Sequence, residues 1–166
     1  FRVDACIIPD GGEMKQAVLG EKGILHLDIT SFGIQAHGSL PSHGKNAIVP
    51  LAALIMELQD IDLGNEYDTN FDGWTLNIGT IEGGIAANVV PARAKVSLDF
   101  RFPTGITKEG IKNAVQEKME RVKANNPDAK FEIQEKLSTV AHMISKDEPI
   151  VQSFERARKK LGIEMS

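Results

Sequence analysis

Hydrophobic periodicity along residues 24–138 is the feature that most constrains how this chain can fold. In four segments apolar side chains alternate with polar ones, as in half-buried strands: residues 25–30, 76–83, 96–101 and 131–137. Two further segments carry apolar residues at every third or fourth position, which predicts amphipathic helices near residues 46–58 and 107–124. The order β-α-β-β-α-β predicts a ferredoxin-like α+β domain, a four-stranded antiparallel sheet with two helices on one face.

Helix-capping and helix-breaking residues agree with this order. Pro50 is tolerated only in the first turn of a helix, so the first helix is expected to begin near Lys45–Asn46, with Asn46 as its cap. Thr107 is expected to cap the second helix. Outside the domain, residues 1–9 predict a short apolar strand and residues 145–166 a further helix.

Composition excludes several classes of protein. The 166 residues include 19 basic and 23 acidic side chains, a net charge of −4, whereas nucleic-acid-binding proteins usually show a basic excess or patch. The longest apolar run, Ala47–Met56, is interrupted by a proline and is too short to span a bilayer. Cys6 is the only cysteine, so no internal disulfide is possible, and a reducing, cytoplasmic location is expected.

The segment 33–45, rich in glycine, serine, proline and histidine, predicts a loop that carries His37. A loop histidine can change its charge near neutral pH and can donate a hydrogen bond to a developing oxyanion. An ordinary surface histidine fits the same pattern. His43 lies six residues further on, but this spacing matches no standard pattern of metal ligands.

Three other polar residues stand where binding chemistry is plausible, each with a plainer alternative. Arg101 is expected to face outward at a strand end, where it can hold a carboxylate through two hydrogen bonds or be a plain surface arginine. Asn88 can bind a ligand or cap a turn. Asp10 can be a metal ligand or a turn former. Nucleophilic catalysis has little support, because Cys6 is expected in a buried apolar strand and the chain has no Gly-x-Ser-x-Gly motif.

Four segments of the chain form a recognisable series: Gly20–Gly23, Gly33–Pro41 running on to Gly44–Ile48, Asn77–Gly84 with Ala87–Pro91, and Asp99–Arg101. In this order and spacing they resemble the lid, or dimerisation, domain of a zinc metallopeptidase family. That family includes carboxypeptidase G, acetylornithine deacetylase, succinyl-diaminopimelate desuccinylase, aminoacylase and several dipeptidases and tripeptidases.

The resemblance implies a division of the chain and roles for four residues. Residues 23–140 would be the lid, and residues 1–22 and 141–166 would be pieces of the catalytic domain into which the lid is inserted. His37 would stabilise the tetrahedral intermediate, usually in the partner subunit's active site, and Asn88 and Arg101 would contact the substrate's carboxylate. Asp10 would be a zinc ligand, although many members have Glu-Pro where this chain has Pro-Asp.

The resemblance also implies cofactors and partners. Two zinc ions would activate a water molecule in the parent enzyme, which would hydrolyse a small peptide or an N-acyl amino acid and associate as a homodimer through the lid. The family's other zinc ligands and its glutamate base would lie outside these residues, so this fragment alone is expected to bind no zinc pair and to be inactive. Two alternatives remain: a stand-alone ferredoxin-like module for oligomerisation or small-molecule binding without catalysis, and a regulatory domain that binds amino acids.

Overall fold

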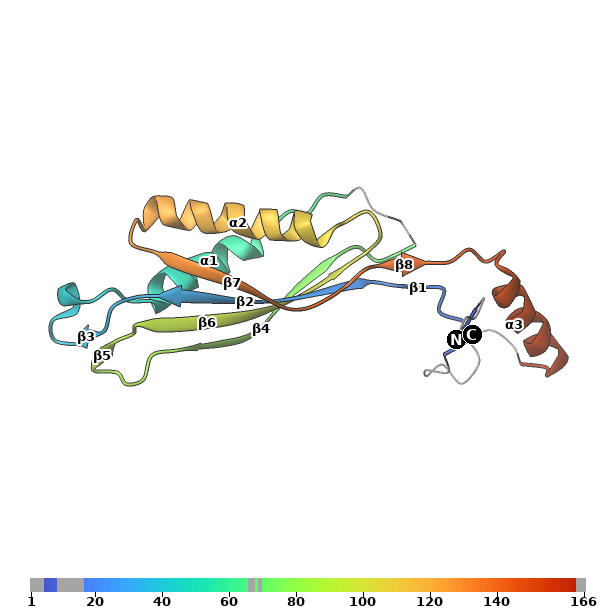
Figure 1. Cartoon of the computed structure of the whole chain (residues 1–166), viewed down its shortest axis with the longest axis horizontal. Helices are drawn as coiled ribbons and strands as arrows, with labels where there is room; N and C mark the ends of the chain where they lie inside the picture. The colour runs from blue at the N-terminus through green and yellow to red at the C-terminus, as the bar shows by residue number, and fades with distance from the viewer. Residues whose placement is uncertain (1–4, 9–16, 66–67, 69, 164–166) are drawn as a thin grey trace. The chain divides into compact units, whose positions relative to one another are not determined.

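The computed structural model describes residues 5–8, 17–65, 68 and 70–163. The chain divides into two compact units. The larger unit is Lys22–Ala141, and the smaller one combines Phe1–Glu21 with His142–Ser166. Figure 1 shows the elements of both units with their labels.

A four-stranded antiparallel sheet forms the larger unit. Its strands are β2 (Gly23–Phe32), β4 (Thr75–Gly83), β6 (Arg93–Phe102) and β7 (Lys130–Thr139), in the order β4-β6-β2-β7. Helices α1 (Ile48–Gln59) and α2 (Lys108–Asn125) lie on the same side of this sheet (Figure 1). The predicted mixed α+β class and the four predicted strands are therefore confirmed.

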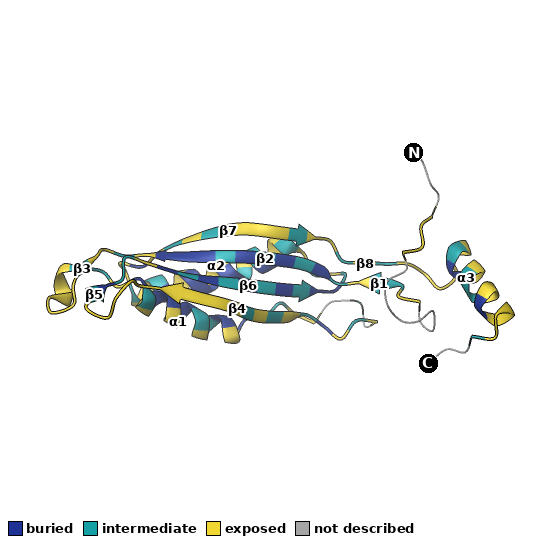
Figure 2. Ribbon diagram, turned by 90° about the horizontal axis from the view of Figure 1, so that it is seen from below, coloured by how far each residue is buried: buried dark blue, intermediate teal, exposed yellow. Residues whose placement is uncertain are grey.

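The core lies between the sheet and the two helices. On β2, the side chains of Leu25, Leu27 and Ile29 are fully buried, whereas His26 and Asp28 between them are only half-buried on the open face. This alternation follows from the strand's period of two. Figure 2 shows that burial is concentrated in the inner strands β2 and β6, while the edge strands β4 and β7 are largely exposed.

The helix starts are close to their predicted positions. The hydroxyl of Thr107 accepts a hydrogen bond from the amide of Gly110 at 3.1 Å, so the predicted cap of α2 is confirmed. Helix α1 begins at Ile48, slightly later than expected, and Pro50 lies in its first turn. Asn46 still serves this helix end, because its side-chain oxygen accepts from the amide of Ile48 at 2.8 Å.

The described residues of the smaller unit form two short strands and a helix. Strand β1 (Gly20–Glu21) pairs antiparallel with β8 (His142–Met143), and α3 spans Pro149–Lys160. The expected buried strand near the N-terminus is wrong for residues 5–8, which form no strand and are exposed, Cys6 included. No strand in the described part of the chain pairs with this segment. Among the described residues, no helix combines the length and the apolar character needed to cross a membrane.

Candidate functional site

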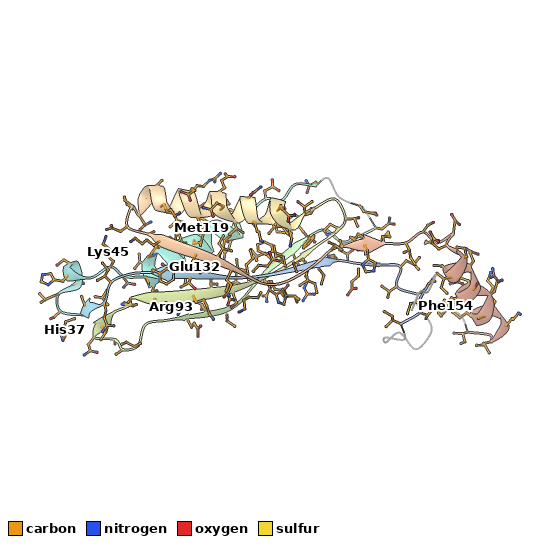
Figure 3. All side chains as sticks on the ribbon, in the orientation of Figure 1. His37, Lys45, Arg93, Met119, Glu132 and Phe154 are labelled. Atoms are coloured by element: carbon orange, nitrogen blue, oxygen red, sulfur yellow. The ribbon has the colours of Figure 1, made fainter. Side chains whose placement is uncertain are left out.

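Segments far apart in the sequence meet at one end of the larger unit, which we call the tip and define as residues 33–47 and 84–92. Here β3 (Ala36–His37) pairs antiparallel with β5 (Val89–Val90), and His37 lies opposite Val89. The amide of Gly38 donates to the carbonyl of Asn88 at 2.7 Å. The structure therefore brings together two of the predicted site residues, His37 and Asn88. Figure 3 shows His37 at the end of the unit.

Backbone hydrogen bonds hold the tip together. The amide of Gly33 donates to the carbonyl of Ala92 at 2.8 Å, and Ile34 and Lys45 exchange hydrogen bonds of 2.8 and 2.9 Å. A Cβ atom on Gly33 would lie only 1.9 Å from the carbonyl oxygen of Lys45, so this close approach requires glycine. The close backbone packing therefore explains why the first residue of the tip, Gly33, is a glycine.

The surroundings of His37 determine which ring nitrogen carries its proton. Its Nδ1 atom accepts a hydrogen bond from the backbone amide of Ser39 at 3.2 Å and lies 2.7 Å from the hydroxyl oxygen of that residue. A backbone N–H can only donate, so Nδ1 acts as an acceptor. In the neutral ring the proton is then on Nε2, and the exposed side chain of His37 offers an N–H donor.

Arg101 lies at the opposite end of the sheet from the tip. On β6, Arg93 is opposite Phe32 next to the tip, whereas Arg101 is opposite Ile24 on one side and Thr75 on the other. The eight residue steps from Arg93 to Arg101 correspond to about 26 Å along a strand. The structure therefore does not bring Arg101 together with the tip residues of the same chain.

The guanidinium of Arg101 is held by Asp99 on the same strand. Arg101 Nε donates to Asp99 Oδ1 at 2.8 Å, and Nη2 donates to Asp99 Oδ2 at 2.9 Å. Across the strand pair, the Nε2 atom of His26 lies 3.3 Å from the same Oδ1 atom. The half-buried Arg101 does lie on the open face of the sheet, as its place in the period-two pattern predicts.

Asp99 and Ser39 are residues that the sequence analysis did not single out. For Asp99 a signal was present, because residues two positions apart on a strand, here Asp99 and Arg101, point to the same face of the sheet. For Ser39 the signal was its position two residues after His37 in a turn-rich loop, where serine often bonds to nearby groups. The sequence also showed no sign of a shallow hollow at the tip, lined mainly by Gly83–Ile85 and Val89–Pro91.

Metal-binding side chains do not gather in the described part of the chain. No group of three or more histidine, cysteine, aspartate or glutamate side chains there could hold a metal ion. Asp10, the expected ligand, lies outside the described residues.

Comparison with family models places most of the chain in a known group. The model of the peptidase dimerisation domain matches residues 19–127. A succinyl-diaminopimelate desuccinylase of Paracoccus denitrificans is 33% identical over 130 residues, which cover 74% of this chain and 33% of the relative. A probable carboxypeptidase of Aspergillus clavatus is 33% identical over 116 residues, covering 66% of this chain and 28% of the relative. The chain thus spans about a third of the length of these curated relatives.

Solved structures show the same fold. An aminopeptidase PepT from Bacillus cereus superposes with a TM-score of 0.70 at 21% identity, covering 95% of this chain and 40% of that one. A tripeptidase from Staphylococcus aureus superposes with a TM-score of 0.64 at 25% identity, covering 90% of this chain and 39% of that one.

Proposed function

This chain belongs to the peptidase dimerisation domain family, and on that premise we propose that it is the lid of a zinc-dependent peptidase or N-acyl-amino-acid amidohydrolase. In this proposal the lid supplies groups to an active site and joins two subunits. The observation that carries it is the tip, where His37 and Asn88 are held next to each other by backbone pairing.

The proposal includes a division of the chain. Residues 23–140 form the lid, with the ferredoxin-like topology, and residues 1–22 and 141–166 belong to the catalytic domain. The strand order β4-β6-β2-β7 with two helices on one side supports the ferredoxin-like topology. The limited share of the relatives' length that this chain covers supports a larger parent protein. The zinc ions of the parent are assigned to that larger protein, together with Asp10 as a ligand.

His37 is the proposed oxyanion donor. When the carbonyl of an amide is attacked, negative charge develops on its oxygen, and a fixed N–H donor lowers the energy of that state more than the energy of the bound substrate. The hydrogen bond from the amide of Ser39 supports this role, because it leaves the proton of the neutral ring on Nε2. Asn88 and Arg101 are the proposed contacts to the substrate's carboxylate.

One substrate molecule cannot reach both His37 and Arg101 of the same lid. An extended tripeptide spans about 11 Å, less than half of the distance along the sheet that separates the tip from Arg101. A two-fold related second copy removes this difficulty if its lid runs in the opposite direction. The tip of one lid then lies near the Arg101 end of the other, and each substrate meets His37 from one subunit and Arg101 from its partner.

The edge strand β4 is the one we propose to pair across the two-fold axis. Of the two edges of the sheet, β7 carries four charged residues, Lys130, Glu132, Glu135 and Lys136, and charges on an edge oppose strand pairing. Strand β4 carries only Glu82, which forms an ion pair with Lys95 of the neighbouring strand. The β4 edge is therefore the better surface for adding a strand.

Exposed apolar residues also favour the β4 side of the lid as the dimer interface. Val49 and Met56 on α1 and Ile81 on β4 are 57%, 62% and 58% exposed. The start of α1 lies beside the end of β4, since a Cβ atom on Gly83 would lie 3.0 Å from the side chain of Ile48. Helix α1 and strand β4 thus border each other, and a second copy would cover apolar side chains as well as the free strand edge.

The experiment that tests the catalytic part of the proposal is His37→Ala in the whole protein. Loss of one oxyanion donor typically lowers turnover on the order of 10²–10³-fold, and we expect a loss of that size with the zinc content unchanged. Turnover is measured with N-succinyl-diaminopimelate, N-acetyl amino acids and dipeptides, and bound zinc by atomic emission.

His43→Ala is the matched control, because His43 is exposed in the same loop. We expect this variant to keep its turnover. Normal turnover in His37→Ala would remove His37 from the reaction, and equal losses in both variants would point to a damaged loop instead of a lost donor.

A further inference from the structure

The ion pair between Asp99 and Arg101 has a geometry that suits orientation of the arginine. We propose that Asp99 is a positioning residue, which holds the guanidinium of Arg101 so that its outer edge meets the carboxylate of the substrate. This inference rests on the proposed function, in which Arg101 binds that carboxylate. Asp99 itself does not touch the substrate in this arrangement.

The hydrogen bonds use one edge of the guanidinium and leave the other for a ligand. Arginine has five N–H donors in a planar group, and Asp99 takes one on Nε and one on Nη2. The three remaining donors are on Nη1 and Nη2, which together form a second fork suited to a carboxylate. Among the described residues, Asp99 is the one partner of the Arg101 side chain.

The position of Asp99 in the sheet suits it to hold the guanidinium of Arg101 in place. It lies on the inner strand β6, opposite His26 on β2 and Asn77 on β4. The Nε2 atom of His26 is buried and lies 3.3 Å from Asp99 Oδ1, without the alignment of a hydrogen bond. Neighbouring strands on both sides limit the movement of the Asp99 side chain, whereas a long arginine side chain has many rotamers to lose on binding.

A purely structural role explains this ion pair poorly. Asp99 and Arg101 are two residues apart on one strand, so their contact ties no two elements together. The side chains are 30% and 42% exposed, and an isolated ion pair with that exposure adds little to stability. By contrast, an arginine that is already oriented loses less conformational freedom when it binds a carboxylate.

The inference is tested with Asp99→Asn in the whole protein. The fastest substrate is first chosen among N-succinyl-diaminopimelate, N-acetyl amino acids and dipeptides. It is then compared with the analogue in which the free carboxylate near the cleaved amide is replaced by a carboxamide. We expect KM for the free carboxylate to rise about tenfold, kcat to change less, and KM for the carboxamide to stay the same. In an Arg101→Gln background, Asp99→Asn should add nothing, because it acts through the arginine.

Controls separate this inference from the proposed function. Asp28→Asn removes another carboxylate of the open face, one that accepts from the hydroxyl of Ser97, and should leave KM unchanged. Asp99→Glu keeps the charge and should restore part of the lost affinity, which also covers the case in which Asp99→Asn folds poorly. If Arg101→Gln raises KM and Asp99→Asn does not, or if both substrate forms lose affinity equally, the inference about Asp99 is overturned and the role of Arg101 stands. If Arg101→Gln leaves KM unchanged, both fall.

Discussion

Glu135 on β7 has the most strongly shifted carboxyl group in the described part of the chain, and the cause is local. Lys112 on α2 forms an ion pair with its carboxylate, the hydroxyl of Ser138 donates to it at 2.6 Å, and the ammonium of Lys108 lies 3.3 Å away. These contacts, that of Lys112 above all, lower the pKa of Glu135 to about 2. They also connect α2 to the sheet, so the charge state of this one residue bears on how the helix is held.

The lowered pKa predicts a pH dependence of stability. Because the pKa of Glu135 is lower in the folded protein than the ordinary 4.5, its ionised form stabilises the fold at pH values above 4.5. That contribution is lost as the pH falls from 4.5 to about 2. We therefore expect Glu135→Gln to be less stable than the wild type at pH 6, and the difference to shrink steadily below pH 4.5. Urea unfolding at a series of pH values measures it.

Glu132→Gln is the control for this measurement. Glu132 lies on the same strand, and Figure 3 labels it. Among the described residues it has no ion pair, so its substitution should leave the pH dependence as it is in the wild type. A difference between Glu135→Gln and wild type that stays constant from pH 6 to pH 3 would contradict the assigned role of Glu135.

At the scale of elements, helices α1 and α2 of the larger unit are joined by a buried lysine. Lys118 on α2 is only 7% exposed, and its Nζ atom donates to the carbonyl of Asp60 at 2.9 Å. Asp60 follows the last residue of α1, where carbonyl groups lack partners within the helix. The ammonium also lies 3.8 Å from the carboxylate of Glu57. A positive charge at a helix C-terminus is favourable, so Lys118 acts as a cap supplied by another helix.

Lys118→Met should keep most of the packing of this side chain and lose the cap. Hydrogen bonds that involve a charged group contribute about 1.5–3 kcal/mol, so we expect a loss of about 2 kcal/mol in the free energy of unfolding. Lys123→Met is the control, since within the described ranges Lys123 pairs only with Glu120 on its own helix, and such pairs contribute about 0.3–0.5 kcal/mol. Chemical denaturation checks both, and equal losses would show that the contact with Asp60 has no special weight.

The longer elements could be predicted from the sequence because their signals are local. Alternation over ten residues of β2 and the cap at Thr107 depend only on neighbours in the chain. Strands β3 and β5 were not predicted, since two residues show no periodicity and their pairing connects segments about 50 residues apart. Residues 5–8 show the reverse case, an apolar segment that finds no partner strand in the described part of the chain.

The candidate site likewise has some features that the sequence could predict and others that it could not. The exposure of His37 follows from the composition of its segment, and the open-face position of Arg101 follows from the strand period. The predicted loop is wrong at His37 itself, which lies in the short strand β3. The contact of Gly38 with Asn88 depends on long-range backbone pairing that no local pattern shows. The family resemblance pointed to His37 and Asn88 separately. That these two residues lie close together, and that Arg101 lies far from them, became visible only in the fold.

At the scale of the whole molecule, the proposed antiparallel dimer would bring opposite ends of the two larger units together. Strand β4 runs from Thr75, opposite Arg101, to Gly83, opposite Ala94 near the tip. When β4 pairs antiparallel with its two-fold copy, the Gly83 end of one strand lies beside the Thr75 end of the other. The proposed dimer would therefore place each tip at the Arg101 end of its partner, so that association and active-site assembly depend on the same strand edge.

A cysteine scan along β4 tests this arrangement, in whole protein whose exposed cysteines, Cys6 included, are changed to serine. A residue at the two-fold axis of an antiparallel pair faces its own copy with Cα atoms about 4.5–5.5 Å apart, within reach of a disulfide. For a residue two positions away from the axis, the Cα atoms of the two copies are about 13 Å apart, which is too far for a disulfide. We expect Gly79→Cys, in the middle of β4, to cross-link on oxidation, and Asn77→Cys and Ile81→Cys to do so only weakly. Glu132→Cys on the opposite edge is the control, and a dimer that cross-links there on non-reducing gels would move the interface to β7.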